Sequence, residues 1–153
     1  MANFSKTSKA LLATCHQDIQ KVMNEAIKRI DFKVLYGHRT PAEQLALFKK
    51  GRKFDNGAWV KVGKTVTDKD GTIRKSKHNY NPSLAIDIIP YPFQGWNNLD
   101  QFHTLHKVIR DVANELGIKL TWGADWDNDG DIREHSLQDY PHYEIRTTGG
   151  LNV

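Results

Sequence analysis

The sequence has one cysteine, Cys15, among its 153 residues. A single thiol excludes an internal disulfide framework and any zinc site built from several cysteines. Because Cys15 falls in an apolar helical pattern, it is predicted to be a small core residue and not a reactive thiol.

Long apolar runs are also missing, which excludes a membrane-spanning helix. The N-terminal stretch "MANFSKTSKALLATCHQD" does not have the form of a signal peptide, because its apolar part is short and interrupted by polar residues. We therefore expect synthesis in a cytoplasm, and any work outside it would need another route of release.

Hydrophobic residues make up 39% of the chain and charged residues 26%, as in a soluble globular protein. The length suits one domain over residues 1–153. The net charge of +4 favours an anionic partner, which could be nucleic acid, a membrane or a polyanionic cell wall. Charge alone does not choose among them. Basic residues are scattered, apart from looser clusters at 49–53 and 74–77.

Two helices and a strand are predicted in the first third of the chain. Apolar residues at helical spacing over 8–30 predict an amphipathic helix, and the β-type residues of 32–37 predict a strand. The stretch from Thr40 to Gly51 begins with threonine, proline and a capping-box glutamate and ends in glycine, which predicts a second helix.

The remaining elements complete a mixed fold. Alternating β-type residues and an Asp-Gly pair within 52–77 predict a short hairpin or an ordered loop. A long helix is predicted over 99–116, ended by Gly117, and further strands are predicted at 84–89, 118–122 and 142–145. The fold class is therefore α+β, with helices packed on a small, mainly antiparallel sheet in a single domain.

Asp87 interrupts an apolar strand between Ile86 and Ile88. A buried carboxylate without a partner is costly, so this position requires a positive group. A structural ion pair with lysine or arginine is one solution. His78, nine residues upstream, offers another, because histidine and a buried carboxylate are common components of metal sites. This stretch alone does not separate the two.

The C-terminal stretch "QDYPHYEIR" supplies a second histidine, His142, which shares one strand face with Glu144. Together, His78, Asp87 and His142 form a three-ligand set for catalytic zinc, with a fourth position left for water. Asp139, three residues before His142, would be free to act on that water.

Four segments, in order, resemble the zinc D-Ala-D-Ala carboxypeptidase and dipeptidase family. "SKHNYNPSLAIDI" is similar to its S-x-H…A-x-D motif and "DYPHYEI" to its closing (Glu/Asp)-x-x-His motif. "GHRTPAEQLALFKKG" resembles its upstream arginine segment, and "LGIKLTWGADWDNDGD" the segment before the last motif. The resemblance spans residues 34 to 146. It is closest to the phage endolysins of this family, which cut the L-alanyl-D-glutamate bond of peptidoglycan stem peptides.

This resemblance implies roles for five residues. His78, Asp87 and His142 would hold zinc, Asp139 would be the general base, and Arg39 would stabilise the charged transition state. The residues alone allow a simpler interpretation of Arg39, a surface ion pair near a helix start. The interval from His78 to Asp87 is nine positions where the family usually has seven, which predicts a longer loop between two converging ligands.

An acidic stretch raises the question of a second metal. Carboxylates alternate in a D-x-D-x-D-G pattern similar to the first half of an EF-hand loop, with Glu134 following. The twelfth position is Ser136 and not the usual glutamate, and a solvated acidic loop is the alternative. The calcium ligands expected here are Asp125, Asp127, Asp129, Asp131 and Glu134.

His103 and His106 lie three apart on the predicted long helix with no third ligand in view, so they are predicted to be helix-surface residues. The four tryptophans are interpreted as core or cleft-wall residues: Trp59, Trp96, Trp122 and Trp126.

Three functions remain open at this point. The first is a zinc peptidase of peptidoglycan, made in the cytoplasm of an infected bacterial cell and released to the wall through a pore. The second is a D-Ala-D-Ala carboxypeptidase, which usually carries an export signal or an anchor. The third is a metal-dependent wall-binding module without turnover. We expect a monomer that binds stem peptides, with no nucleic-acid partner and no insertion into a membrane.

Overall fold

The computed structural model describes residues 2–125 and 139–146 of the chain. Its helices are α1 (Lys6–Leu12), α2 (Gln17–Ala26), α3 (Pro41–Lys49), the 3-10 turn η1 (Lys77–Asn79) and α4 (Asp100–Leu116). Its strands are β1 (Phe32–Tyr36), β2 (Arg52–Asp55), β3 (Ala58–Lys61), β4 (Ala85–Pro90), β5 (Thr121–Trp122) and β6 (His142–Glu144).

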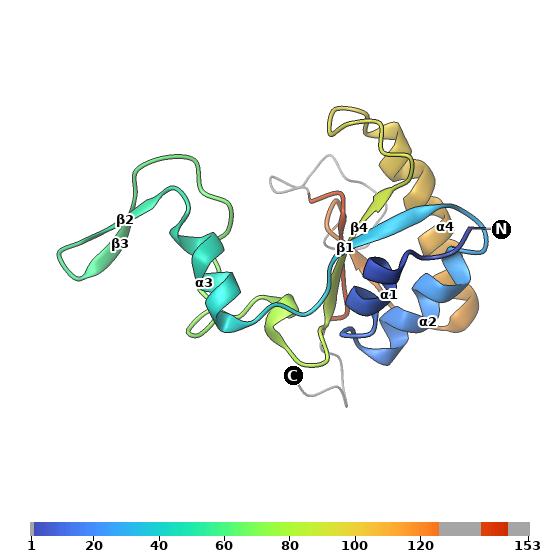
Figure 1. Ribbon diagram of the computed structural model, residues 1–153, viewed down its shortest axis with the longest axis horizontal. Helices are drawn as coiled ribbons and strands as arrows, with labels where there is room; N and C mark the ends of the chain where they lie inside the picture. The colour runs from blue at the N-terminus through green and yellow to red at the C-terminus, as the bar shows by residue number, and fades with distance from the viewer. Residues whose placement is uncertain (1, 126–138, 147–153) are drawn as a thin grey trace.

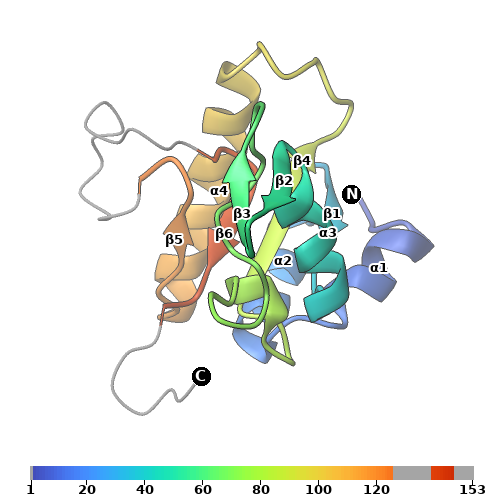
Figure 2. The ribbon, with the colours of Figure 1, turned by 90° about the vertical axis from the view of Figure 1, so that its left-hand side faces the viewer.

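A four-stranded antiparallel sheet in the order β1-β4-β6-β5 forms the centre of the molecule. Helices α1, α2 and α4 cover one face of it, and α3 with the β2–β3 hairpin projects on the other side (Figures 1 and 2). The hydrophobic core lies between the sheet and its three covering helices. The predicted α+β fold is confirmed.

The helix predicted over 8–30 is divided into α1 and α2. The main chain between them is bound by a distant segment: Ser83 N–H donates to the Thr14 carbonyl at 2.9 Å, and His16 N–H donates to the Ser83 carbonyl at 2.8 Å. These groups cannot serve a continuous helix as well. Cys15 is buried at the break, and burial raises the pKa of its thiol to about 12, as expected of an inert core residue.

Helix α3 begins as predicted. The Thr40 hydroxyl accepts from Glu43 N–H at 3.1 Å, and the Glu43 carboxylate accepts from Thr40 N–H at 2.9 Å. These two bonds close the capping box. Gly51 follows the helix with a φ of 77°, and a Cβ there would collide with the Lys64 carbonyl, so only glycine fits this neck.

The predicted hairpin is present, but its turn lies at Asn56–Gly57 and not at Asp70–Gly71. Asn56 and Gly57 have φ values of 49° and 79°, the pair of left-handed residues that a type I′ turn requires. The Asp70 carboxylate instead accepts three backbone N–H groups in the following loop.

The last third of the fold matches the prediction with one difference. Helix α4 ends at Gly117, which has a φ of 70°. Strand β5 has two residues, shorter than the predicted 118–122. Within residues 2–125 and 139–146, no helix combines the length and the apolar character needed to cross a membrane.

Candidate metal centre and active site

Strand β4 brings two of the expected ligands together through its register. It pairs with β6 so that Asp87 lies directly opposite His142, and with β1 so that Asp87 lies opposite Tyr36. The polar residue in an apolar strand therefore faces a histidine from the neighbouring strand.

His78 reaches the same point from η1, outside the sheet. The Ser76 hydroxyl accepts from His78 N–H at 3.2 Å, and the Asn79 side chain accepts from Ser76 N–H at 2.8 Å, which closes a capping box around the turn. The His78 carbonyl accepts from Arg39 N–H at 2.8 Å. These bonds fix residues 76–79, where the longer loop that leads to Asp87 begins.

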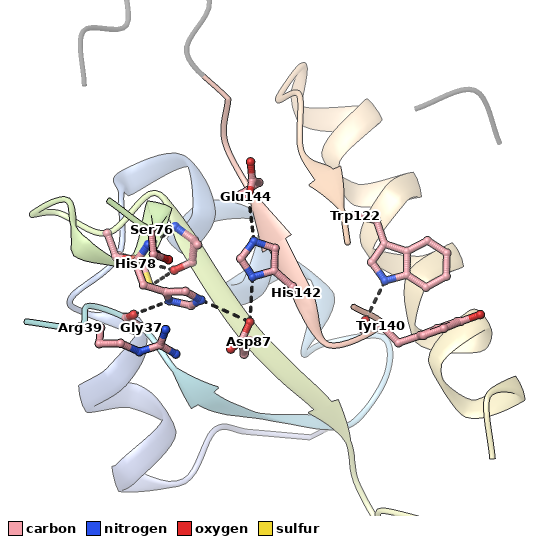
Figure 3. A network of polar contacts seen from close by, with 12 residues as sticks. Gly37, Arg39, Ser76, His78, Asp87, Trp122, Tyr140, His142 and Glu144 are labelled. Atoms are coloured by element: carbon pink, nitrogen blue, oxygen red, sulfur yellow. Dashed lines mark hydrogen bonds and ion pairs between the residues drawn. The ribbon is translucent and has the colours of Figure 1, made fainter. Parts of the chain in front are cut away.

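The three side chains converge tightly (Figure 3). His78 Nε2 lies 3.4 Å and His142 Nδ1 lies 3.0 Å from the same Asp87 oxygen, Oδ1. One ligand atom from each residue lies within 4.8 Å of the others. Tetrahedral zinc separates its ligand atoms by about 3.3–3.6 Å. The three residues can therefore hold a metal ion.

Each histidine also has a hydrogen-bond acceptor on its other ring nitrogen. His78 Nδ1 lies 2.7 Å from the Gly37 carbonyl, and His142 Nε2 lies 2.8 Å from the Glu144 carboxylate. A proton on each of these nitrogens leaves a lone pair on the nitrogen that faces Asp87. Metal-binding histidines in proteins have the same kind of acceptor on the ring nitrogen that faces away from the metal, so these contacts fit a metal site.

The ion-pair alternative for Asp87 does not hold in the described part of the chain, where the partners of its carboxylate are the two histidines. Burial alone would raise the pKa of Asp87, but hydrogen bonds with His142 and His78 bring it well below its usual range. Burial would lower the pKa of His142, whereas Asp87 and Glu144 raise it to about 10.

Asp139 lines a cleft beside the three residues, together with Asp87. Burial of its carboxyl group, and then the negative charge of Asp87, raise the pKa of Asp139 above its usual value. The backbone places it there, because Asp139 N–H donates to the Gly123 carbonyl at 2.8 Å and the Asp139 carbonyl accepts from His142 N–H at 3.1 Å.

Arg39 approaches from the other end of the site, at the start of α3. Its guanidinium donates to the side chain of Gln44 at 2.8 Å and lies 5.4 Å from the ring centre of Tyr36. Gln44 is fully buried and also donates to the Lys69 carbonyl at 3.0 Å. Arg39 makes no ion pair with any residue described, so the surface ion-pair interpretation does not hold there.

The cleft beside the metal ligands has a volume of about 370 Å³. Its wall is mainly apolar and aromatic, and Trp96 stacks on Phe102 with ring centres 6.1 Å apart. Trp96 is thus a cleft-wall residue, as predicted. The lining consists of Leu35, Tyr36, Asp87, Trp96, Leu99, Phe102, Asp139, Tyr140 and Pro141.

Sequence reasoning missed Gln44, Glu144 and Gly37 as supports of the site. A signal existed only for Glu144, which shares a strand face with His142. The contact of His78 with the Gly37 carbonyl depends on how distant segments meet. Gln44 lies only five residues from Arg39, but neither residue type by itself indicates the contact.

The expected calcium ligands Asp127, Asp129, Asp131 and Glu134 lie outside the described residues, so calcium binding stays a prediction. Asp125, the first of the set, is described and buried.

The surface prediction holds for His103, which is exposed, and is wrong for His106. The His106 ring stacks on Trp122 with ring centres 3.8 Å apart and contacts the Tyr143 hydroxyl at 3.1 Å. Burial lowers the pKa of His106 to about 4. The helical pattern did not reveal that β5 and β6 cover this side of α4.

Comparisons with known proteins identify the family of the chain. The family model described as phage L-alanyl-D-glutamate peptidase matches residues 1–146. The L-alanyl-D-glutamate peptidase of Escherichia phage T5 is 35% identical over 136 residues, which cover 86% of each chain. The crystal structure of the Serratia marcescens L-Ala D-Glu endopeptidase ChiX has the same fold, with a TM-score of 0.65 over 94% of this chain and 90% of the other at 21% identity.

Proposed function

The chain belongs to the phage L-alanyl-D-glutamate peptidase family, and we propose that it is a zinc-dependent endolysin that hydrolyses the L-alanyl-D-glutamate bond of peptidoglycan stem peptides. The observation that carries the proposal is the convergence of His78, Asp87 and His142 on one point, beside a cleft that also contains a further carboxylate.

The donor set supports zinc in particular. Two imidazoles and one carboxylate suit zinc in a catalytic site, where three protein ligands leave a fourth position open. When bound, zinc would supply Lewis-acid chemistry that activates water near neutral pH and polarises a carbonyl group. Gly37 and Glu144 would keep the two imidazoles in the tautomers that present a lone pair to the ion.

Asp139 is proposed as the general base. Its carboxylate lines the cleft next to Asp87, and its raised pKa makes it a better proton acceptor than an ordinary aspartate. It would take a proton from the attacking water and deliver it to the leaving amine. The positive charge of Arg39 is near enough to act weakly on Asp139, in the direction that lowers the pKa of the carboxyl group.

Arg39 is proposed to stabilise the negative charge that develops on the carbonyl oxygen. A fixed donor in such a position contributes about 3–4 kcal/mol in other hydrolases. Gln44 orients the guanidinium, because its buried amide accepts from Arg39 and is itself fixed by the Lys69 carbonyl. The cleft wall around Trp96 would bind the uncharged parts of the substrate.

The two alternative functions have less support. The family match favours an endopeptidase over a D-Ala-D-Ala carboxypeptidase. A wall-binding module would need neither an open metal position nor a neighbouring base. Synthesis in the infected cell followed by release through a pore, and a second ion of calcium in the acidic loop, remain parts of the proposal.

Digestion of purified peptidoglycan followed by mass spectrometry of the fragments tests the proposal. We expect free stem peptides that begin with D-glutamate and glycan fragments that end in L-alanine. Release of D-alanine alone would indicate the carboxypeptidase, and unchanged peptidoglycan in the presence of zinc would indicate binding without turnover.

A further inference from the structure

The chain's excess positive charge lies in one segment, residues 41–75, which we call the arm. Nine of the 22 lysine and arginine residues and four of the 18 acidic residues fall within it. The arm therefore has a net charge of +5 and the rest of the chain a net charge of −1. It comprises α3, the β2–β3 hairpin and the loop after it, and it projects from the sheet (Figure 1).

The arm also carries more than half of the large apolar side chains that are exposed in the described residues. Among the residues described, eleven large hydrophobic side chains are exposed, and six of them belong to the arm: Phe54, Trp59, Val60, Val62, Val66 and Ile73. The arm contributes no residue to the hydrophobic core. A concentration of exposed apolar groups in one basic segment is typical of an interaction surface.

One side of the hairpin combines both properties. Phe54 and Trp59 lie directly opposite each other, and their rings meet edge to face at 5.3 Å. The Lys49 ammonium lies 5.5 Å from the ring centre of Trp59, and Lys61 follows Trp59 on the same side of the strand. We call these four residues the hairpin face: Lys49, Phe54, Trp59 and Lys61.

The hairpin face lacks anionic partners of its own. Neither of its lysines forms an ion pair with a described residue. Lys61 lies opposite Arg52 across the two strands, a like-charge pair that is unfavourable unless an anion lies nearby. Charge complementarity therefore points to an anionic partner, and it disfavours a second copy of the same face.

Both ends of the arm are fixed at the metal centre. Arg39, just before the arm, donates its N–H to the His78 carbonyl, and its own carbonyl accepts from the Asn79 side chain at 2.8 Å. The buried Gln44 in α3 contacts Arg39 itself. A polymer bound on the arm would therefore be held close to the site that is proposed to cut it.

We propose that the hairpin face binds uncleaved peptidoglycan, through the carboxylates of its stem peptides and the apolar faces of its sugars, apart from the bond being hydrolysed. The inference rests on the proposed function, because it takes the substrate polymer as the partner. The lysines neutralise the carboxylates, and Phe54 and Trp59 supply rigid surface for the sugar rings. A single-domain enzyme thereby stays on an insoluble substrate between cuts.

The test separates binding to the polymer from cleavage. Binding is measured by co-sedimentation with purified sacculi in the full-length Asp139→Asn background, which leaves the wall intact. The variants are Lys49→Gln/Lys61→Gln and Phe54→Ser/Trp59→Ser, and the matched control is Lys21→Gln/Lys33→Gln, which removes the same charge outside the arm. We expect both arm variants to bind sacculi at least about tenfold more weakly and the control to bind like the parent.

Cleavage is measured with the same substitutions in the active enzyme. On a soluble stem peptide, the arm variants should keep kcat/KM within about twofold, whereas on sacculi their rate should fall as binding does. Equal sacculus binding by arm and control variants overturns the proposal. So does stronger binding of the parent to vesicles of phosphatidylglycerol and phosphatidylethanolamine (1:3), lost in the arm variants, which would assign the face to a membrane surface.

The two proposals fail separately. If the parent cannot cleave the soluble peptide, the proposed function is wrong, and the sedimentation result still decides whether the hairpin face binds the wall.

Discussion

The helix-covered sheet and the arm are built on opposite principles. The sheet fixes its residues by burial: Ile86 and Ile88 on either side of Asp87 have no exposed surface. The arm contributes nothing to the hydrophobic core, and its segments are tied to one another by hydrogen bonds from Gln44 and Arg52 to main-chain carbonyls. The metal centre lies where the two meet. It takes Asp87 and His142 from the sheet, and His78 from the turn to which the arm returns.

This difference indicates a division of labour. The sheet sets the distance between two ligands through strand register, which a packed core holds to within a fraction of an ångström. The arm presents charge and aromatic surface to the surroundings, and its Gln44 accepts a hydrogen bond from Arg39. The sheet would then fix the positions of the ligands, and the arm would contact the substrate polymer away from them.

The largest expected effect comes from removing a ligand on either side of this division. His78→Ala and His142→Ala should each lose stoichiometric zinc and all measurable activity, because two remaining ligands rarely hold the ion. Zinc is measured by atomic absorption after dialysis, with Lys21→Ala as the control. One zinc per chain in His78→Ala would show that Asp87 and His142 of the sheet suffice and that His78 is dispensable.

Asp139→Asn should lower kcat by about 10²–10⁴-fold and keep zinc, because the amide preserves shape but cannot accept the proton. The loss should be equal on soluble peptide and on sacculi, in contrast to the arm variants. Steady-state kinetics on both substrates, with zinc content measured in parallel, test this. A kcat near that of the parent would assign the base to another group.

Core and arm should also differ in stability. Ile88→Ala removes buried methylene groups and should cost about 2–5 kcal/mol of unfolding free energy. Val62→Ala, at a side chain that is 64% exposed in the arm, should change it by less than about 0.5 kcal/mol. Urea unfolding monitored by circular dichroism measures both. Comparable losses would mean that the arm has a packed interior after all.

A smaller effect is expected for the groups that orient the two histidines. His78 is oriented by a main-chain carbonyl that no substitution removes, whereas His142 relies on the Glu144 side chain. Glu144→Ala should weaken zinc binding by about 10–100-fold. Glu144→Gln retains a hydrogen-bond acceptor and should therefore keep part of the zinc affinity that Glu144→Ala loses. Competition with a chromogenic chelator gives the affinities, and unchanged binding in Glu144→Ala would remove its orienting role.

The smallest effect concerns His106, on the sheet side. Its pKa is about 4 in the folded state and about 6.5 when unfolded, so the unfolded chain binds the proton more readily. Stability should therefore fall as pH drops from about 6.5 towards 4, by an amount on the order of 1 kcal/mol by pH 5. Unfolding of the parent, His106→Gln and the control His103→Gln across this range measures it. A slope unchanged in His106→Gln would contradict the assignment.

Local signals in the sequence predicted the elements that depend on near neighbours. The capping box of α3 and the glycine stop of α4 need only residues within one turn, and both were correct. The Asn56–Gly57 pair is an equally local signal and the strongest short-range indication of a hairpin, and the structure places the turn there and not at Asp70–Gly71.

What depended on distant segments could not be predicted. The break between α1 and α2 requires Ser83, and the environment of His106 requires β5 and β6. The three candidate metal ligands could be selected from the sequence because a histidine or an aspartate is unusual in a buried strand or turn, and the structure brings the three together. The acceptor that orients His78 is the main-chain carbonyl of Gly37, a group that every residue has, so the sequence does not mark it.

The β2–β3 hairpin can be exchanged as a unit, because hydrogen bonds join the chain on its two sides at Gly51. The Gly51 carbonyl accepts from the N–H groups of both Val62 and Gly63, at 2.9 and 3.1 Å, so the chain leaves and re-enters the neck at almost one point. Residues 53–60 can therefore be replaced by a hairpin of different length or charge while the ends stay in register and Arg52 keeps its bonds to the Phe48 and Thr67 carbonyls. In evolution or in engineering, exchange of this hairpin could alter the preference for one bacterial wall over another, while the residues of the candidate active site stay unchanged.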